Sequence, residues 1–578
     1  MALDRMRTDG IVWAALCALG AHVAACSESS SAGGNPGPLG AGGMVGGGGA
    51  AGSTAGAAGE KEAGSMEAGR AGDDGPTSAD QESSADGGEA DVSRDGAAGA
   101  NDASGGSEAS RPHNLVFRLI DPIPEHKLKP GEDPFGIAVD TSVVGLSLDQ
   151  SVVVGLSEIT RDHTADGGYS YGYEPFRWTE STGSVSLGLP PGAIVSDRRA
   201  TRNFPMFMSA DASVVVGWFG WGAPDEAVFR WTLASGMVSL GHVAETSRLT
   251  LRAMSSDGAV VAGTITDVDA AFHTEALEWT TRSGWVRLGK IPGHTDSEVV
   301  GVSSDGSLIV GWSGIPFRRT PVLWPQGADI RSLDKAPGFD SCEPLTMTPD
   351  GKVIAGVCTR GSTTRVFRWT ESTGFEIVGI PSVSITYELG GISSDGAVLV
   401  GNYENSLSGE LQPFRFTEAG GAQGLGVLPG YVKSSLARDV FAMSADGTVV
   451  TGKAGDSNGL GPAFRWTETA GMASLGLLPG HNDSHASSVS PDGSFITGRS
   501  GSAAPGTYPR VADAVVWDAR GAIHSIPADL VAAGIDLRGY RPHDAWIAVN
   551  NGKVAYYGVA VGVDVDVNRR RGWVEWLP

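Results

Sequence analysis

The stretch Pro462–Ser500, PAFRWTETAGMASLGLLPGHNDSHASSVSPDGSFITGRS, recurs with variations along this chain of 578 residues. Related phrases are EPFRWTESTGSVSLGLPPG at 174–192 and RVFRWTESTGFEIVGIP at 365–381. Each copy has two halves. One is Phe-Arg-Trp-Thr followed by a turn and Leu-Gly, and the other is Ser-x-Asp-Gly followed by a β-branched run that ends in Gly. A phrase repeated at a fixed period indicates one structural unit used many times.

The Ser-x-Asp-Gly half predicts a tight hairpin, because Asp-Gly between two apolar runs is a strong short-range hairpin signal. Clear copies begin at Ser255, Ser303, Thr348, Ser393, Ser444 and Ser490. Degenerate copies begin at Ser147, Ser209 and Val549. Each hairpin joins two short strands and is not followed by a helical pattern, so we expect an all-β fold.

The aromatic half alternates with these turns at a spacing of roughly 45–60 residues, the period of a propeller blade. Its anchors are Trp178, Trp231, Trp279, Trp324, Trp369, Phe416, Trp466, Trp517 and Trp576. Four strands per unit predict a β-propeller of about nine blades, with eight as the alternative because the first and last units are degenerate. The last unit ends after its third strand, and the segment LVFRLID from Leu115 is expected to supply the fourth.

In Phe-Arg-Trp, the two aromatic residues share one face of a strand while arginine points to the other face. We expect the aromatic residues to pack between blades, and an unpaired buried charge would be costly. The arginines are therefore predicted to pair with a repeated Asp or Glu. They are Arg177, Arg230, Arg368, Arg415 and Arg465.

Over roughly residues 140–578 the chain resembles the bacterial extracellular proteins with HAF-type repeats. The resemblance rests on PAFRWTETAGMASLG, SPDGSFITG and the tail AWIAVNNGKVAYYG. The chain departs from that pattern in two ways, because the histidine of the motif is absent and the turn is mostly Asp-Gly. The copy PDGK also looks like TolB-type propeller repeats. The resemblance to HAF-type proteins implies an exported propeller of mostly unknown activity, and the resemblance to TolB-type repeats implies the same fold.

The first 113 residues predict export and anchoring. Residues 1–25 contain the short apolar run Ile11–Ala25 and are read as a lipoprotein signal peptide, because Val-Ala-Ala before Cys26 resembles the lipobox in which the cysteine is acylated. An ordinary signal peptide is the alternative. Residues 26–113 are rich in Gly, Ala, Ser, Asp and Glu and predict a disordered tether. Residues 114–578 then form the propeller. We expect an outer-membrane lipoprotein or a surface protein of the bacterial cell envelope.

Cys342 and Cys358 are placed symmetrically about the turn TPDGK, so they are expected to face each other across one hairpin. An exported compartment favours a disulfide, while two buried thiols are the alternative. The spacing has no CxxC element and does not suggest zinc.

The net charge of −24 argues against a nucleic-acid partner, because phosphate binding needs clustered Lys and Arg. Possible metal ligands occur in His294–Glu298 and His481–His485, but both are read as polar connectors between blades. No metal site and no cofactor are predicted. Calcium at Asp564–Asn568 is the weaker alternative to a charged outer edge.

Two loops carry aromatic residues beyond those of the repeat. The candidate ligand-binding residues are Tyr169, Tyr171, Tyr173, Trp218, Phe219 and Trp221. Aromatic side chains on adjacent loops suit stacking on sugar rings or gripping a peptide, and mutual packing of long loops is the alternative. No catalytic residue is nominated. We expect a monomeric, non-catalytic binding scaffold for polysaccharide, an envelope component or protein. The alternatives are a glycan lyase or glycosidase, or a purely structural surface component.

Overall fold

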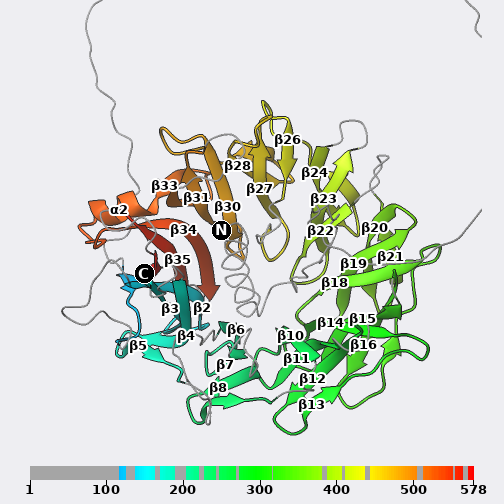
Figure 1. The fold of residues 1–578 in the computed structure, drawn as a ribbon. Coiled ribbons are helices and arrows are strands. Elements are labelled where there is room, and N and C mark those ends of the chain that lie inside the picture. The colour runs from blue at the N-terminus through cyan, green and yellow to red at the C-terminus, as the bar shows by residue number, and fades with distance from the viewer. Residues whose placement is uncertain are drawn as a thin grey trace, which may run out of the picture. The chain divides into compact units, whose positions relative to one another are not determined.

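The computed structural model describes residues 116–124, 137–162, 169–188, 204–219, 227–241, 247–267, 272–315, 317–379, 387–405, 410–436, 443–503, 512–550, 553–563 and 570–577. Nine antiparallel sheets of four strands each follow one another around a ring (Figure 1). The predicted propeller of about nine four-stranded blades is therefore confirmed, with nine blades. The predicted signal peptide, Cys26 and the tether lie outside the described residues. Among those described, no helix is long and apolar enough to cross a membrane.

In the first eight blades the strands run outward in chain order from the centre of the ring (Figure 1). The first three blades are β2 (Ile137–Leu146), β3 (Val152–Asp162), β4 (Tyr169–Thr179), β5 (Gly183–Ser186); β6 (Phe204–Met208), β7 (Val214–Phe219), β8 (Ala227–Thr232), β9 (Gly236–Ser239); and β10 (Ser247–Met254), β11 (Val260–Asp267), β12 (Thr274–Thr280), β13 (Gly284–Arg287). The next three are β14 (Asp296–Val302), β15 (Leu308–Ile315), β16 (Arg318–Pro325), β17 (Arg331–Ser332); β18 (Ser341–Met347), β19 (Val353–Arg360), β20 (Thr363–Thr370), β21 (Gly374–Val378); and β22 (Tyr387–Ile392), β23 (Val398–Asn405), β24 (Glu410–Thr417), β25 (Gly421–Gly424). The seventh and eighth are β26 (Lys433–Ser435), β27 (Val449–Gly455), β28 (Ala463–Thr467), β29 (Gly471–Ser474); and β30 (Asp483–Val489), β31 (Ile496–Gly501), β32 (Ala512–Trp517), β33 (Ile523–Ser525).

The ninth blade closes the ring with both ends of the propeller. It consists of β34 (Tyr540–Asn550), β35 (Lys553–Gly562), β36 (Arg570–Leu577) and, as its outermost strand, β1 (Val116–Ile120). β1 pairs antiparallel with β36, with Val116 opposite Trp576 and Ile120 opposite Gly572. The prediction that the segment from Leu115 supplies the missing strand is thus confirmed. Trp178 of the first blade also stacks on Trp576, with ring centroids 5.8 Å apart.

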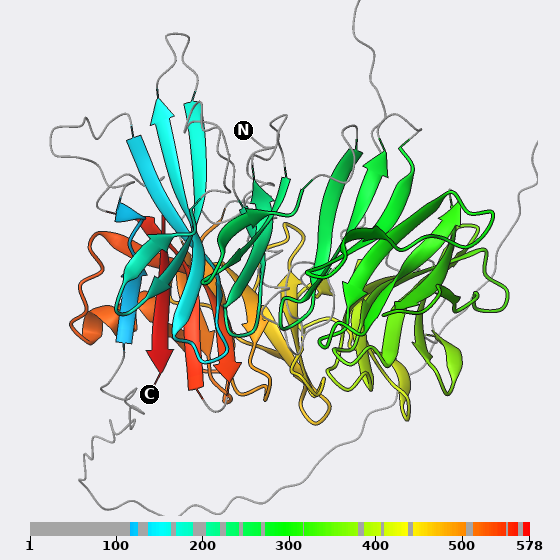
Figure 2. The same cartoon turned by 90° about the horizontal axis from the view of Figure 1, so that it is seen from below.

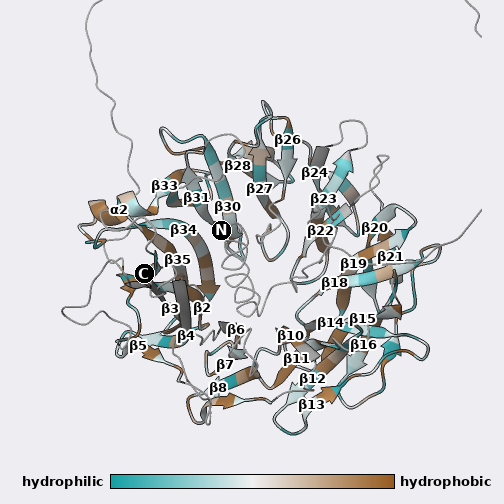
Figure 3. Cartoon of the chain, viewed as in Figure 1, coloured by the Kyte–Doolittle hydropathy of each residue, from teal (hydrophilic) through white to brown (hydrophobic). Residues whose placement is uncertain are grey.

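The hydrophobic core is divided among the interfaces between blades. One cluster of buried apolar side chains lies between each pair of neighbouring sheets. Hydrophobic segments accordingly follow the strands in Figure 3. One feature was not predicted, the helix α2 (Ile526–Ala532) after β33, which is capped by Ser525 and buries Ile526 and Leu530 against the ninth blade.

Each Ser-x-Asp-Gly turn is held by its own side chains. In the fourth blade, Ser303 Oγ donates to Asp305 Oδ1 at 2.7 Å and accepts the Leu308 N–H at 3.0 Å. Gly306 has φ 72°, and a Cβ there would lie 2.7 Å from Cγ2 of Val260 in the preceding blade. The glycine is therefore required both by the turn and by the close approach of two blades.

The turns are also joined to one another. The residue between Ser and Asp donates its N–H to the carbonyl of the equivalent residue in the next blade. These bonds run Leu148–Ala210–Ser256–Ser304–Pro349 and Ser394–Ala445–Pro491. Each series ends at a proline, which has no N–H to continue it. The Asn550 side chain donates to the Leu148 carbonyl at 2.6 Å and links the last blade to the first.

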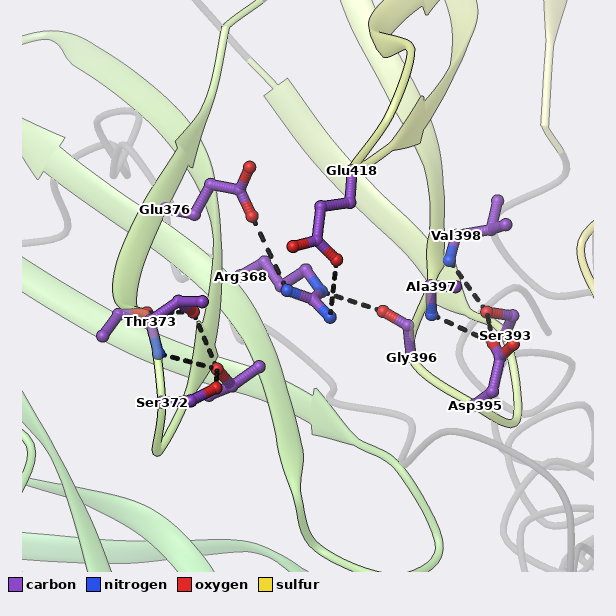
Figure 4. Close-up of polar contacts among 12 residues, drawn as sticks. Arg368, Ser372, Thr373, Glu376, Ser393, Asp395, Gly396, Ala397, Val398 and Glu418 are labelled. Carbon is purple, nitrogen blue, oxygen red and sulfur yellow. Dashed lines mark hydrogen bonds and ion pairs between the residues drawn. The ribbon is translucent and has the colours of Figure 1, made fainter.

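The repeated arginine has a different partner from the one predicted. Arg368 Nε donates to the carbonyl of Gly396, in the next blade's turn, at 2.9 Å, and Glu376 and Glu418 lie 3.6 and 3.9 Å away (Figure 4). Arg415 makes the same bond to Gly447 at 2.9 Å. The longer contacts of Arg230 with Gly258 and of Arg465 with Gly493 follow the pattern. These four arginines therefore share a backbone carbonyl as partner, and for Arg368 the predicted pairing with carboxylates is present in addition.

The aromatic anchors contribute to the same joints. Arg230 lies over the ring of Trp279 and Arg415 over that of Trp466, at 5.8 and 5.6 Å from the centroids. In both cases the arginine belongs to one blade and the tryptophan to the next. The phrase Phe-Arg-Trp is repeated because the blades that carry it use it to hold the next blade.

Cys342 and Cys358 lie directly opposite each other in β18 and β19, and a disulfide joins them. Both are fully buried within the cluster between the fourth and fifth blades.

Candidate functional site on the hairpin face

The propeller has two chemically different faces, which follow from the antiparallel order of the strands. The turns between the first and second and between the third and fourth strands of each blade lie on one face, which we call the turn face. The hairpins between second and third strands and the connectors between blades lie on the other, which we call the hairpin face. The turn face carries the repeated hydrogen bonds, so variable residues on the hairpin face are the better candidates for function.

The longest hairpin on this face belongs to the first blade. β3 and β4 have 11 residues each, whereas β7 and β8 have 6 each. The pair (cyan) projects at one edge of the ring in Figure 2. Tyr169, Tyr171 and Tyr173 lie within β4, paired with Asp162, Thr160 and Glu158, so they belong to a strand and not to a loop. Their side chains lie outside what the structure describes.

Trp218 is in a different environment from the one predicted. It lies in β7, is only 9% exposed, and packs with Phe207, Leu251 and Trp279 between the second and third blades. Trp218 therefore has a packing role, which was the alternative considered for these aromatic residues. We remove Trp218 from the candidate ligand-binding residues. Phe219 ends β7 opposite Ala227, and its side chain is outside the described set, as is the whole of Trp221.

Two exposed aromatic residues were not recognised as candidates from the sequence. Phe272 and Phe317 lie at the hairpins of the third and fourth blades and are 68% and 93% exposed. Both have positive φ, 61° and 64°, which is unfavourable for a residue with a Cβ. The repeat gives no signal for them, since they lie between its two halves.

The two histidine-containing connectors have parallel structures. His294 Nδ1 lies 3.0 Å from Ser313 Oγ, and His481 Nδ1 lies 3.0 Å from Ser500 Oγ. Asp296 pairs with His273 at 3.0 Å, whereas Asp483 pairs with Lys453 at 2.6 Å. Across the described residues no group of three potential ligands could hold a metal ion. The calcium alternative at Asp564–Asn568 falls outside the described part of the chain.

The innermost strands bring together ionisable residues that the sequence analysis did not single out. Glu298, Glu343 and Glu388 occupy the same register in three consecutive blades, each opposite the residue that follows the glycine of the second strand. Asp544 takes this position in the ninth blade and His485 in the eighth. Each glutamate lies five residues before the Ser or Thr of its turn, and this constant spacing would have identified the set.

Three of these carboxylates form ion pairs with arginines of the preceding blade. Glu298 pairs with Arg252 at 3.5 Å, Glu343 with Arg319, and Asp544 with Arg499 at 2.9 Å. Arg319 also lies 4.2 Å from the centroid of Trp312. The arrangement joins the inner edges of neighbouring blades by charge, in addition to the hydrogen bonds of the turn face.

Burial and neighbouring charges shift the pKa values of these groups in different directions. Burial raises the pKa of Glu298, although Arg252 and Arg319 oppose it. Burial would also raise the pKa of Asp544, but Arg499 and His543 outweigh it and the pKa is lowered. Burial, with Arg499 and Lys453 nearby, lowers the pKa of His485 to about 3, so this imidazole is neutral at pH 7.

No family model and no curated protein sequence matches the chain. Solved structures that are similar include a prolyl endopeptidase, at 12% identity and a TM-score of 0.37, covering 74% of this chain and 55% of that one. An oligogalacturonate lyase in complex with manganese is 14% identical, with a TM-score of 0.32 and coverage of 58% and 92%. TolB from Acinetobacter baumannii is 13% identical, with a TM-score of 0.28 and coverage of 54% and 77%. The chain thus spans about half the length of the prolyl endopeptidase, and the likenesses concern the fold alone.

Proposed function

We propose that the protein is an exported, lipid-anchored propeller of the bacterial cell surface that binds a polysaccharide, an envelope component or a protein without catalysis. The observation that carries the proposal is the pairing of the inner-strand carboxylates. Glu343 and Asp544, two carboxylates of the innermost strands, form ion pairs with Arg319 and Arg499 of the preceding blades. Ion pairs of this kind join neighbouring blades and engage carboxylates that acid–base catalysis would otherwise use.

Binding is further supported by the hairpin face. Phe272 and Phe317 expose large aromatic surfaces at loop ends, where packing gains nothing from them. Aromatic rings on a rigid scaffold suit recognition of sugar rings and of apolar peptide side chains.

A glycan-cleaving enzyme is the second candidate, because the raised pKa of Glu298 is what a general acid requires. Glu343 also interacts electrostatically with Glu298, as paired carboxyls of a glycosidase would. The two candidates differ in what Glu298→Gln does. If the protein is a binding scaffold, Glu298→Gln leaves ligand binding intact. If the protein is an enzyme, the same substitution abolishes cleavage of the glycan.

Binding is tested with the intact protein on an array of cell-wall and exopolysaccharide glycans. A variant with Tyr171, Tyr173 and Trp221 changed to Ala tests the first two hairpins, and Trp218 is left unchanged because it is buried. Leu233→Ala is the matched control, since Leu233 is 79% exposed in a turn of the opposite face. Specific glycan binding supports the proposal. Absence of any binding by the wild type, to glycans or to envelope proteins, would contradict it.

Anchoring is tested separately by labelling cells with a fatty-acid analogue. We expect incorporation that is lost in Cys26→Ser, and an unlabelled, freely secreted wild type would contradict the lipid anchor.

A further inference from the structure

A cavity of about 300 Å³ opens between the third and fourth blades. Its walls come from the hairpin β11–β12, from the end of β13 and from the connector that leads to β14. All of these belong to the hairpin face. The volume is at the lower end of the range for small-molecule sites and is sufficient for one or two sugar rings.

The cavity walls mix hydrogen-bond donors and acceptors that are already held in place. The charged and histidine side chains are Asp267, His273, Glu275, Arg287, Lys290 and His294, and Thr274 and Thr295 add hydroxyl groups. Glu275 forms an ion pair with Arg287, and Lys290 Nζ donates to the Thr295 carbonyl at 2.9 Å. These contacts fix the side chains and use only part of their hydrogen-bonding capacity, since an ammonium group has three donors and a guanidinium five.

The two histidines each present one ring nitrogen. His273 is fixed through Nδ1 by Asp296 Oδ1, and His294 through Nδ1 by Ser313 Oγ, both at 3.0 Å. Within the described residues, neither Nε2 has a protein partner. His273 is 43% exposed, so its ring is accessible from the cavity mouth.

An exposed aromatic residue adjoins this polar set in the chain. Phe272 directly precedes His273, is 68% exposed and has φ 61°. A left-handed backbone at a non-glycine residue costs about 1–2 kcal/mol, and exposing the ring gains no packing in return. An exposed flat apolar face beside several fixed donors and acceptors matches a sugar ring, which has one face of C–H groups and a rim of hydroxyls.

We propose that this cavity is a carbohydrate-binding site, in which Phe272 stacks on a glycosyl ring while His294, Lys290 and Glu275 bind its hydroxyls. The inference rests on the proposed binding function and gives it a location and a ligand class. The fourth-blade residue Phe317 provides a matched comparison. It is an exposed phenylalanine with nearly the same φ, 64°, on the adjacent hairpin. Neither phenylalanine is part of the cavity wall, but Phe272 directly precedes the wall residue His273, whereas Phe317 adjoins no wall residue in the chain.

The test measures binding of cellobiose, chitobiose and digalacturonate to the intact protein by titration calorimetry. The variants are Phe272→Ala, His294→Ala and the control Phe317→Ala, each checked for folding by circular dichroism. We expect at least one disaccharide to bind the wild type, an affinity loss of about tenfold or more in Phe272→Ala and His294→Ala, and no change in Phe317→Ala.

The outcomes separate this inference from the proposed function. If the glycan array shows binding that Phe272→Ala and His294→Ala retain, the cavity assignment is wrong and the binding function stands. An equal loss in Phe317→Ala would also overturn the assignment, because the ligand would then lie across the hairpins and not in the cavity. If the wild type binds none of the disaccharides and nothing on the array, both the carbohydrate site and glycan binding as the proposed function are wrong.

Discussion

At the scale of single residues, the turn aspartates are held ionised. Their pKa is lowered at seven positions: Asp149, Asp211, Asp305, Asp350, Asp395, Asp446 and Asp492. For Asp305 the main cause is the hydrogen bond from Ser303. For Asp350 burial acts to raise the pKa, but the hydrogen bond from Thr348 and the contacts with Lys352 lower it to about 2.

This lowering predicts how stability depends on pH. The folded state favours the ionised carboxyls, so their contribution is present above the ordinary pKa of 3.8 and is lost as the pH falls through the lowered values, about 2 for Asp350. We expect the urea midpoint of unfolding to fall steeply below about pH 4. In a variant that carries both Asp305→Asn and Asp395→Asn, we expect the midpoint to depend less steeply on pH. A midpoint independent of pH in this range would contradict the role of the turns.

Arg368 gives a second prediction at this scale. It is 6% exposed and joins the fifth blade to the turn carbonyl of Gly396. Arg368→Ala leaves this joint without its donor, so we expect unfolding free energy to fall by about 2–3 kcal/mol in chemical denaturation. The control is Arg331→Ala, because Arg331 is half exposed, pairs with exposed Glu371 and lies 5.9 Å from the centroid of the Trp369 ring, and such exposed contacts are each worth about 1 kcal/mol or less. Equal effects of the two changes would contradict the joint.

The sequence predicted the turns and the repeated aromatic anchors, but not every hydrogen-bond partner of the repeated arginine. A pattern of side chains suggests that an arginine pairs with a carboxylate. The main partner of Arg368 is instead a backbone carbonyl, which every residue has and which a sequence pattern therefore does not reveal. Trp218 appeared to be an extra aromatic residue because it lies outside the repeat, yet it fills the core beside Trp279. The constant spacing of Glu298, Glu343 and Glu388 before their turns is present in the sequence. That these residues share one position on the innermost strands became clear only from the fold.

At the scale of the element, the glycine that ends each apolar run has a structural cause. The first strand of the fifth blade carries a β-bulge between Pro344 and Thr346, and Gly356 of β19 lies opposite it. A Cβ at Gly356 would lie 2.1 Å from the Glu343 carbonyl oxygen and 2.8 Å from the Phe367 ring. The sequence showed the glycine at the end of the run but not the bulge that demands it.

Gly356→Ala is therefore expected to lower the unfolding free energy by about 2–3 kcal/mol through overpacking. Gly379→Ala is the control, because nothing lies within 4 Å of a Cβ there and its φ is not in the positive range. We expect a change of less than about 0.5 kcal/mol for the control, measured by the same urea titration. A neutral Gly356→Ala would show that the bulge is not fixed as described.

At the scale of the whole molecule, the ring depends on one short strand. β1 contributes buried Phe117, Leu119 and Ile120 to the interfaces of the ninth blade. The need for this strand was predictable from the incomplete last unit. The helix α2 was not, because its few residues carry no periodic pattern long enough to read.

Deleting residues 116–120 should open the ring. Loss of three buried apolar side chains and of the pairing with β36 is expected to cost at least about 5 kcal/mol of unfolding free energy. Deleting residues 30–110 is the control, and we expect no change in the denaturation midpoint. If the strand deletion were as stable as the control, closure by β1 would be wrong.

The measurement that tests non-catalytic binding most directly combines affinity with product analysis. The glycan that binds best on the array is incubated with the intact wild-type protein and with Glu298→Gln, and its mass is then determined. We predict saturable binding by both proteins and recovery of the glycan with unchanged mass. A glycan that is shortened or carries a new double bond after incubation with the wild type, and remains intact with Glu298→Gln, would show that the propeller is an enzyme.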